Sequence, residues 1–129
     1  MRVGENKMSV LSSIVNVEFD NYEAPESYRA KYVLVEISTP EGDSKIVARA
    51  KRGAAYHRDV YEPFQQQART KNIHASMMGG GRIEVNSALK TLLVYGYSVD
   101  FGKADHKVTV SLAQEQFPEW DISYSDDGY

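Results

Sequence analysis

The 129-residue sequence contains no cysteine. A disulfide scaffold, a thiolate zinc site, a cysteine nucleophile and a thiol switch are therefore excluded. Long apolar runs are missing too, since stretches such as Tyr32 to Val35 are far shorter than the about 20 residues that span a bilayer. Residues 1–17 lack the apolar region of a signal peptide, so we expect a cytoplasmic location without membrane association.

A strong excess of one charge is also absent. The 15 Lys and Arg residues are opposed by 18 Asp and Glu residues, which leaves a net charge of −3. Nucleic-acid binders usually carry a strongly basic domain, so we expect no nucleic-acid partner. The charges are nevertheless uneven, because residues 44–58 contain five bases and no acid, and residues 108–129 contain five acids and no base. These segments are either two solvated surfaces or, for residues 44–58, a local anion site.

The length and the hydrophobic content of 42% fit one domain with a sizeable core, spanning residues 1–129 with a variable N-terminal strand and loop at 1–30. We expect an exposed loop at 20–27 and helices over 53–71 and 104–117, the first of them kinked or divided at Pro63. Apolar alternation predicts strands near residues 14–19, 31–37, 45–50, 73–85, 91–99 and 120–124. The predicted fold class is therefore α/β, a single domain with a mixed sheet of about six strands flanked by two helices. Apolar residues on both faces of 31–37 predict a sheet that is covered on both sides.

Motifs of familiar hydrolase and metal sites are missing. There is no Gly-x-Ser-x-Gly elbow, and His57, His74 and His106 show no short metal-ligand spacing and no accompanying carboxylate cluster. We therefore expect no metal. The run Gly79-Gly80-Gly81-Arg82 is a weak phosphate loop because no Lys-Ser/Thr pair follows it, and such a run between strands more often marks a bulge or a close backbone approach.

His57 is the most promising catalytic candidate on chemical grounds. It lies one turn inside the start of the first predicted helix, directly after most of the basic run. Free N–H groups and a partial positive charge at a helix N-terminus favour phosphate and disfavour a protonated imidazole, which would leave His57 neutral and able to accept a proton. The alternative is a surface histidine on an amphipathic helix.

Six short segments lie in order along the chain: Lys31-Tyr32-Val33-Leu34-Val35, Tyr56-His57-Arg58-Asp59-Val60-Tyr61, Gly79-Gly80-Gly81-Arg82-Ile83, Tyr95-Gly96-Tyr97-Ser98, Phe101-Gly102-Lys103-Ala104-Asp105-His106 and Asp127-Gly128-Tyr129. Together they closely resemble the Janus/phosphohistidine phosphatase family over about residues 31–129. The resemblance implies a six-stranded mixed sheet flanked by two helices. It also implies a small, cofactor-free phosphatase whose partners are histidine-phosphorylated proteins. From the size of the chain and the lack of an obvious apolar interface stripe we expect a monomer.

The resemblance assigns the site as follows. His57 corresponds to the family's essential histidine, and Lys31 corresponds to a lysine that contacts the phosphate or the substrate. Backbone N–H groups of Ser98, Val99 and Asp100 would line the phosphate site. His57 would act as a general base or as a nucleophile, and we favour the general base.

The resemblance also extends to residues at the edge of the site. Arg49 and Arg82 match family arginines there, although each could equally be a surface or structural arginine. His106 matches as well, and for it we favour a structural or supporting role.

Besides a longer segment at residues 20–30, the sequence departs from the family pattern at three places. Gly53-Ala54-Ala55 replaces a bulky aromatic residue and an acid, Arg58 replaces a small residue, and Asp100 replaces a residue that is often neutral. A carboxylate of Asp100 that points inward would repel the substrate. The main alternative function is therefore a non-catalytic phosphoprotein-binding or regulatory member of the same family.

Overall fold

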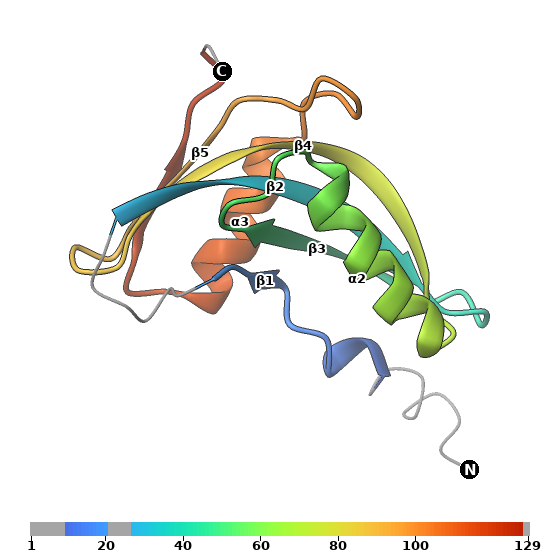
Figure 1. Ribbon diagram of the computed structural model, residues 1–129. Coiled ribbons are helices and arrows are strands. Elements are labelled where there is room, and N and C mark those ends of the chain that lie inside the picture. Colours follow the sequence, from blue (N-terminus) through green and yellow to red (C-terminus); the bar gives the residue numbers. More distant parts are fainter. Residues whose placement is uncertain (1–9, 21–26, 128–129) are drawn as a thin grey trace.

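The computed structural model of the chain describes residues 10–20 and 27–127 (Figure 1). Its six-stranded sheet has the order β1-β3-β2-β4-β5-β6. The strands are β1 (Val17–Glu18), β2 (Ser27–Ser38), β3 (Ser44–Lys51), β4 (His74–Asn86), β5 (Thr91–Tyr95) and β6 (Asp121–Tyr124), and the helices are α2 (Arg58–Thr70) and α3 (His106–Gln116). The central pairs β3–β2, β2–β4 and β4–β5 are antiparallel, whereas β1–β3 and β5–β6 are parallel. The predicted α/β class with a mixed sheet is confirmed.

The two labelled helices lie on opposite faces of the curved sheet, with α2 in front and α3 behind in Figure 1. The strand β2 supplies both cores, because its successive side chains point to opposite faces. Val33 packs in the cluster that contains Val60 of α2, and Leu34 packs in the cluster that contains Ala113 of α3. All four side chains are buried. The prediction of a sheet covered on both sides is thus correct.

The helix α2 begins five residues later than the sequence predicts. Gly53 has a φ of +83°, which continues a turn rather than a helix. The carboxylate of Asp59 accepts a hydrogen bond from the N–H of Tyr56 at 3.0 Å, which fixes the start of the helix beyond this turn. Pro63 lies inside α2 and does not divide it. Of the two expectations for this position, a kinked or a divided helix, the divided helix is therefore wrong.

Several strand ends also differ from the predicted ones. β2 begins at Ser27, and the buried Tyr28 and Ala30 continue its pairing with β4 beyond the predicted start. β5 ends at Tyr95 rather than at Val99, because Gly96 has a φ of +74° and turns the chain. The expected loop at 20–27 falls largely on residues 21–26, which lie outside the described residues, as do residues 1–9 and 128–129.

The glycine run lies within β4 and shows both expected features of such a run. The pairing register between β2 and β4 shifts between Leu34 and Val35, which marks a bulge opposite these residues. Backbone carbonyl oxygens of neighbouring strands approach Gly80 and Gly81 so closely that neither position has room for a Cβ atom. The alternative reading of the run as a phosphate loop has no support in the fold, because the glycines form a strand and not a strand-to-helix turn.

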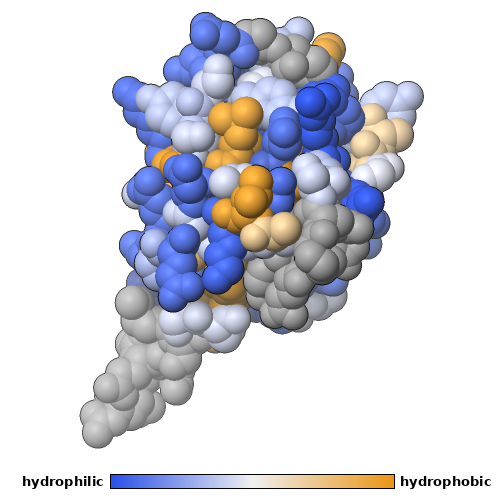
Figure 2. Space-filling model, turned by 90° about the vertical axis from the view of Figure 1, so that its left-hand side faces the viewer, coloured by the Kyte–Doolittle hydropathy of each residue, from blue (hydrophilic) through white to orange (hydrophobic). Residues whose placement is uncertain are grey.

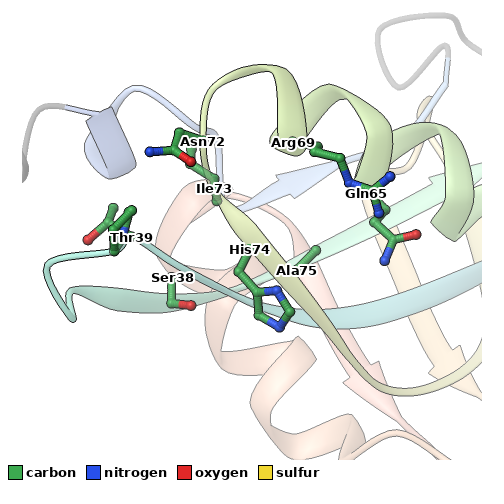
Figure 3. A pocket seen from close by; sticks show the side chains of 9 residues that line it. Ser38, Thr39, Gln65, Arg69, Asn72, Ile73, His74 and Ala75 are labelled. Atoms are coloured by element: carbon green, nitrogen blue, oxygen red, sulfur yellow. The ribbon is translucent and has the colours of Figure 1, made fainter.

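A surface pocket of about 320 Å³ lies at the C-terminal end of α2. Figure 3 shows that its lining comes from the end of β2 (Ser38), from α2 (Gln65, Arg69) and from the start of β4 (His74). Figure 2 shows the side of the molecule formed by the left of Figure 1, where hydrophobic atoms form small groups among hydrophilic ones. In the described part of the chain, no helix has the length and apolar character needed to span a membrane.

Candidate active site

His57 is the N-cap residue of α2, and its side chain is buried against β4. The Nε2 atom lies 2.8 Å from the carbonyl oxygen of Gly81. Because a carbonyl oxygen only accepts hydrogen bonds, Nε2 carries the hydrogen and donates it. In the neutral ring the lone pair therefore resides on Nδ1, so Nδ1 is the atom that can accept a proton.

Two consecutive glycines in β4 allow this close approach. A Cβ atom added at Gly80 would lie 2.7 Å from Cδ2 of His57 and 3.1 Å from Cβ of Ser98, so these two side chains meet over Gly80. A Cβ atom added at Gly81 would lie 2.8 Å from Cε1 of His106 and 2.9 Å from Cε1 of Tyr32. One histidine therefore contacts the glycine pair from the α2 side and the other contacts it from the α3 side.

Lys31 and Arg82 are directly paired across β2 and β4, so their side chains leave the same face of the sheet. Lys31 is two residues from Val33, which packs under α2, so this face is the one that carries His57. The structure thus brings Lys31, Arg82 and His57 together, as the sequence predicted. Two cations beside a histidine at a helix N-terminus form a site suited to an anion.

The surroundings lower the pKa of His57 below its ordinary value. Burial is the main cause, and the positive charges of Lys31 and Arg82 act in the same direction. The hydrogen bond with Gly81 and the carboxylate of Asp100 oppose this shift, but burial and the cations prevail. His57 is therefore neutral at pH 7 and able to act as a base.

A tight turn between Ser98 and Gly102 forms the neighbouring wall. The N–H of Ser98 donates to the carbonyl of Gly102 at 3.2 Å, the N–H of Gly102 donates back at 2.9 Å, and Oγ of Ser98 accepts from the N–H of Phe101 at 3.1 Å. Ser98 is buried, and its backbone and its hydroxyl oxygen stabilise the turn through these hydrogen bonds. Within the described residues, the N–H groups of Val99 and Asp100 make no hydrogen bond, so these two remain available to an anion.

Arg49 is oriented toward other partners. Its guanidinium donates to the carbonyl oxygens of Val15 at 2.9 Å and Ala48 at 2.8 Å, and it lies 3.4 Å from the carboxylate of Glu18. These contacts tie β3 to the segment that contains β1. They support the structural alternative for Arg49, whereas Arg82 lies beside His57.

His106 belongs to a buried network behind the sheet. Its Nε2 lies 2.8 Å from the carbonyl oxygen of Gly96, so Nε2 donates and Nδ1 accepts from the hydroxyl of Tyr32 at 2.7 Å. Thr109 lies 3.0 Å from the same hydroxyl and donates to it. Burial raises the pKa of Tyr32 well above its ordinary value, so the hydroxyl keeps its proton. This network supports the structural role of His106.

The sequence signals the glycine run but not what the run contacts. Gly81 and Tyr32 lie in two of the family segments, but nothing in the sequence shows that the carbonyl of Gly81 orients His57 or that Tyr32 lies behind Gly81. Within residues 10–20 and 27–127, no group of three or more His, Asp or Glu side chains is arranged to hold a metal ion. The site therefore combines a neutral base and two cations with a neighbouring turn whose two backbone N–H groups are free of internal hydrogen bonds in the part of the chain that the structure describes.

Comparison with known proteins places this arrangement in a family. The sequence profile of the Janus/Ocnus family matches residues 14–121, which include every site residue described above. The chain belongs to the Janus/Ocnus family. The resemblance seen in the sequence is thereby confirmed.

Among its Janus/Ocnus relatives, the 14 kDa phosphohistidine phosphatase of Sus scrofa is 35% identical over 105 residues, which cover 77% of this chain and 83% of the relative. The protein of the same name from Homo sapiens is 30% identical over 105 residues, with coverage of 77% and 84%. The sex-regulated protein janus-A of Drosophila melanogaster is 38% identical over 99 residues, with coverage of 77% and 73%. The first two names state a phosphatase activity, and the third states none.

Proposed function

We propose that this Janus/Ocnus protein is a phosphohistidine phosphatase that acts on histidine-phosphorylated proteins. The observation that carries the proposal is the state of His57, a neutral imidazole whose Nδ1 lone pair is free of internal hydrogen bonds in the described structure. Lys31 and Arg82 beside it suit a phosphoryl group. The names of the relatives from Sus scrofa and Homo sapiens support phosphohistidine as the substrate.

The substrate would bind through its phosphoryl oxygens. Lys31 and Arg82 neutralise the negative charge, and the N–H groups of Val99 and Asp100 donate to the oxygens. Hydrogen bonds in which one partner is charged are roughly twice as strong as neutral ones, so these four groups can fix the phosphorus atom in front of His57. Positioning and neutralisation are the main tasks in phosphoryl transfer, because the transition state is loose.

In the favoured route, Nδ1 of His57 accepts a proton from a water molecule while the water oxygen attacks phosphorus. The P–N bond breaks, and its electron pair stays on the imidazole nitrogen of the substrate. General base catalysis of this kind contributes typically ~10²–10⁴ in rate. In the alternative route, Nδ1 itself attacks phosphorus and forms a phosphorylated His57, which water then hydrolyses. Trapping a phosphorylated chain during turnover would assign the alternative route.

A non-catalytic phosphoprotein-binding module is the second candidate function. The carboxylate of Asp100 favours it over turnover, because its negative charge raises the pKa of His57 and so works against the neutral base that hydrolysis needs. The two functions differ in turnover, since a binding module would retain phosphohistidine unchanged.

Phosphate release from a phosphohistidine peptide tests the proposal. The phosphoserine peptide of the same sequence is the substrate control. We expect hydrolysis of the first peptide by the wild-type chain, loss of that activity in His57→Asn, and normal activity in His74→Asn, a matched change at an exposed histidine near the opposite end of α2. A folded wild-type chain that leaves phosphohistidine intact would refute the proposal.

A further inference from the structure

Asp100 lies at the middle of the turn between Ser98 and Gly102, and this turn is fixed to the strand that carries the site. The N–H of Gly80 donates to the carbonyl of Gly102 at 3.0 Å, and the N–H of Ala104 donates to the carbonyl of Gly80 at 3.0 Å. In Figure 1 the loop beyond β5 lies beside the N-terminal end of α2. The position of Asp100 relative to His57 is therefore set by backbone hydrogen bonds within the turn and from its C-terminal side to β4.

Asp100 lies on the same turn as Ser98, close to the reacting groups. Asp100 is two residues from Ser98, whose side chain meets His57 over Gly80, so its Cα is at most about 7 Å from that of Ser98. Within the described residues, Asp100 forms no ion pair and no hydrogen bond through its carboxylate. Its negative charge acts on the imidazole of His57 and raises the pKa of that ring.

The site therefore combines charges of both signs. Lys31 and Arg82 lie on the sheet side, and Asp100 lies on the exposed rim of the turn. Lys31 and Arg82 attract a phosphoryl dianion, whereas the carboxylate of Asp100 repels it. A phosphoryl group attached to a cation is attracted by all three side chains, because its cation can lie against Asp100. The charge pattern thus matches a zwitterionic ligand better than a plain phosphate.

We propose that the Asp100 carboxylate binds the protonated leaving group of a phosphoramidate substrate. The inference rests on the proposed phosphatase function and names its substrate class, which is an N-phosphorylated group that carries a positive charge. A phosphohistidine ring protonated on its second nitrogen belongs to this class, and so does a protonated phospholysine.

The reaction balances with this assignment. The substrate ring donates the N–H of the nitrogen remote from phosphorus to Asp100 and carries one positive charge. When the P–N bond breaks, its electron pair stays on the ring, which leaves as neutral imidazole and keeps the N–H. Water supplies a hydroxyl to phosphorus and a proton to Nδ1 of His57, so the products are hydrogen phosphate, imidazole and a protonated His57. Asp100 favours the protonated ring, which is the better leaving group.

The test compares one ligand that carries the cation with one that lacks it. The full chain, Asp100→Asn and the matched control Asp121→Asn are assayed for kcat/KM on a phosphohistidine peptide and for the dissociation constant of inorganic phosphate. Asp121 is exposed and pairs with Thr91 at the end of β5 remote from Tyr95 and the turn. The two readouts separate recognition of the leaving group from simple repulsion of phosphate.

The two readouts should move in opposite directions. In Asp100→Asn we expect kcat/KM on the peptide to fall by about three- to tenfold, the loss of a charge-assisted hydrogen bond at a solvent-accessible position. Phosphate should bind more tightly in the same variant, and Asp121→Asn should match the wild type. An Asp100→Asn variant in which kcat/KM on the peptide and the affinity for phosphate both rise, or in which neither changes, would overturn the inference while the phosphatase function stands. A wild-type chain that binds phosphate without hydrolysing the peptide would overturn the proposed function and the inference together.

Discussion

Nε2 of His57 lies 2.8 Å from the carbonyl oxygen of Gly81, although 24 positions separate the two residues in the sequence. This hydrogen bond joins the first turn of α2 to the central strand β4. It selects one tautomer of the imidazole and leaves Nδ1 as the nitrogen that can accept a proton. The catalytic proposal depends on this single contact, because it decides which nitrogen can accept a proton.

The pH dependence should follow the lowered pKa of His57. A base must be neutral to accept a proton, so activity is full above its pKa and is lost as the pH falls through it. Burial and the neighbouring cations lower this pKa, so the acid limb of kcat/KM should lie below the ordinary histidine value of about 6.5. A pH–rate profile combined with NMR titration of the His57 ring checks this. An acid limb above that value, together with a matching His57 titration, would contradict the assignment.

Gly80→Ala should reduce turnover by displacing the imidazole. The added Cβ would lie 2.7 Å from Cδ2 of His57 and 2.9 Å from the carbonyl oxygen of Tyr32, which is closer than real Cβ contacts. A displacement of about 1 Å costs roughly 10²-fold in rate when it moves a catalytic group. Overpacking in addition lowers the free energy of unfolding by about 1–3 kcal/mol. Measurement of kcat on the folded variant, with thermal unfolding as the control, tests this. Wild-type kcat in Gly80→Ala would show that the ring position is not needed.

Tyr32→Phe should destabilise the protein from within the α3 core. The hydroxyl of Tyr32 connects His106 to Thr109, and all three side chains are buried. Its removal leaves buried polar groups without partners, so the free energy of unfolding should fall by about 1–3 kcal/mol. Tyr56→Phe is the matched control at an exposed position and should change stability by less than about 0.5 kcal/mol. Equal stabilities of the two variants in urea unfolding would disprove the role of the network.

Much of the fold is predictable from the sequence because the signals are local. Alternation in residues 31–37 identifies β2, and the spacing of Val60, Phe64 and Ala68 identifies α2. The ends of the helices and strands are harder to predict from the sequence, because Gly53 and Gly96 adopt positive φ values that depend on the assembled turns. Such turns moved the start of α2 and the end of β5 from their predicted places.

The site was predictable in part. His57, Lys31 and Arg82 come together as the family motifs imply, because each motif places its residue on a definite element. Arg49 differs in that its guanidinium is held by carbonyl oxygens of a segment more than 30 residues away, a long-range contact without a sequence signal. The role of the Gly81 carbonyl has no sequence signal either, because every residue has a backbone carbonyl.

Lys31→Ala and Arg49→Lys should separate binding from stability. Loss of Lys31 removes a cation beside the phosphate position, so phosphate affinity should fall about tenfold with little change in stability. Lysine at position 49 cannot reproduce the several directed hydrogen bonds of the guanidinium, so we expect a loss of about 1–3 kcal/mol in stability with phosphate affinity kept within about twofold. Phosphate titration and urea unfolding of both variants measure the two effects. The reverse pattern would place Arg49, and not Lys31, in the site.

The most direct test of the central claim is the initial rate of phosphate release from a phosphohistidine peptide in excess EDTA, measured for the wild type and for His57→Asn. The account predicts that the wild type hydrolyses the peptide under these conditions. It also predicts that His57→Asn binds inorganic phosphate but is slower by at least about 10²-fold, the lower range of general base catalysis. A His57→Asn variant that retains most of the wild-type rate would contradict the account.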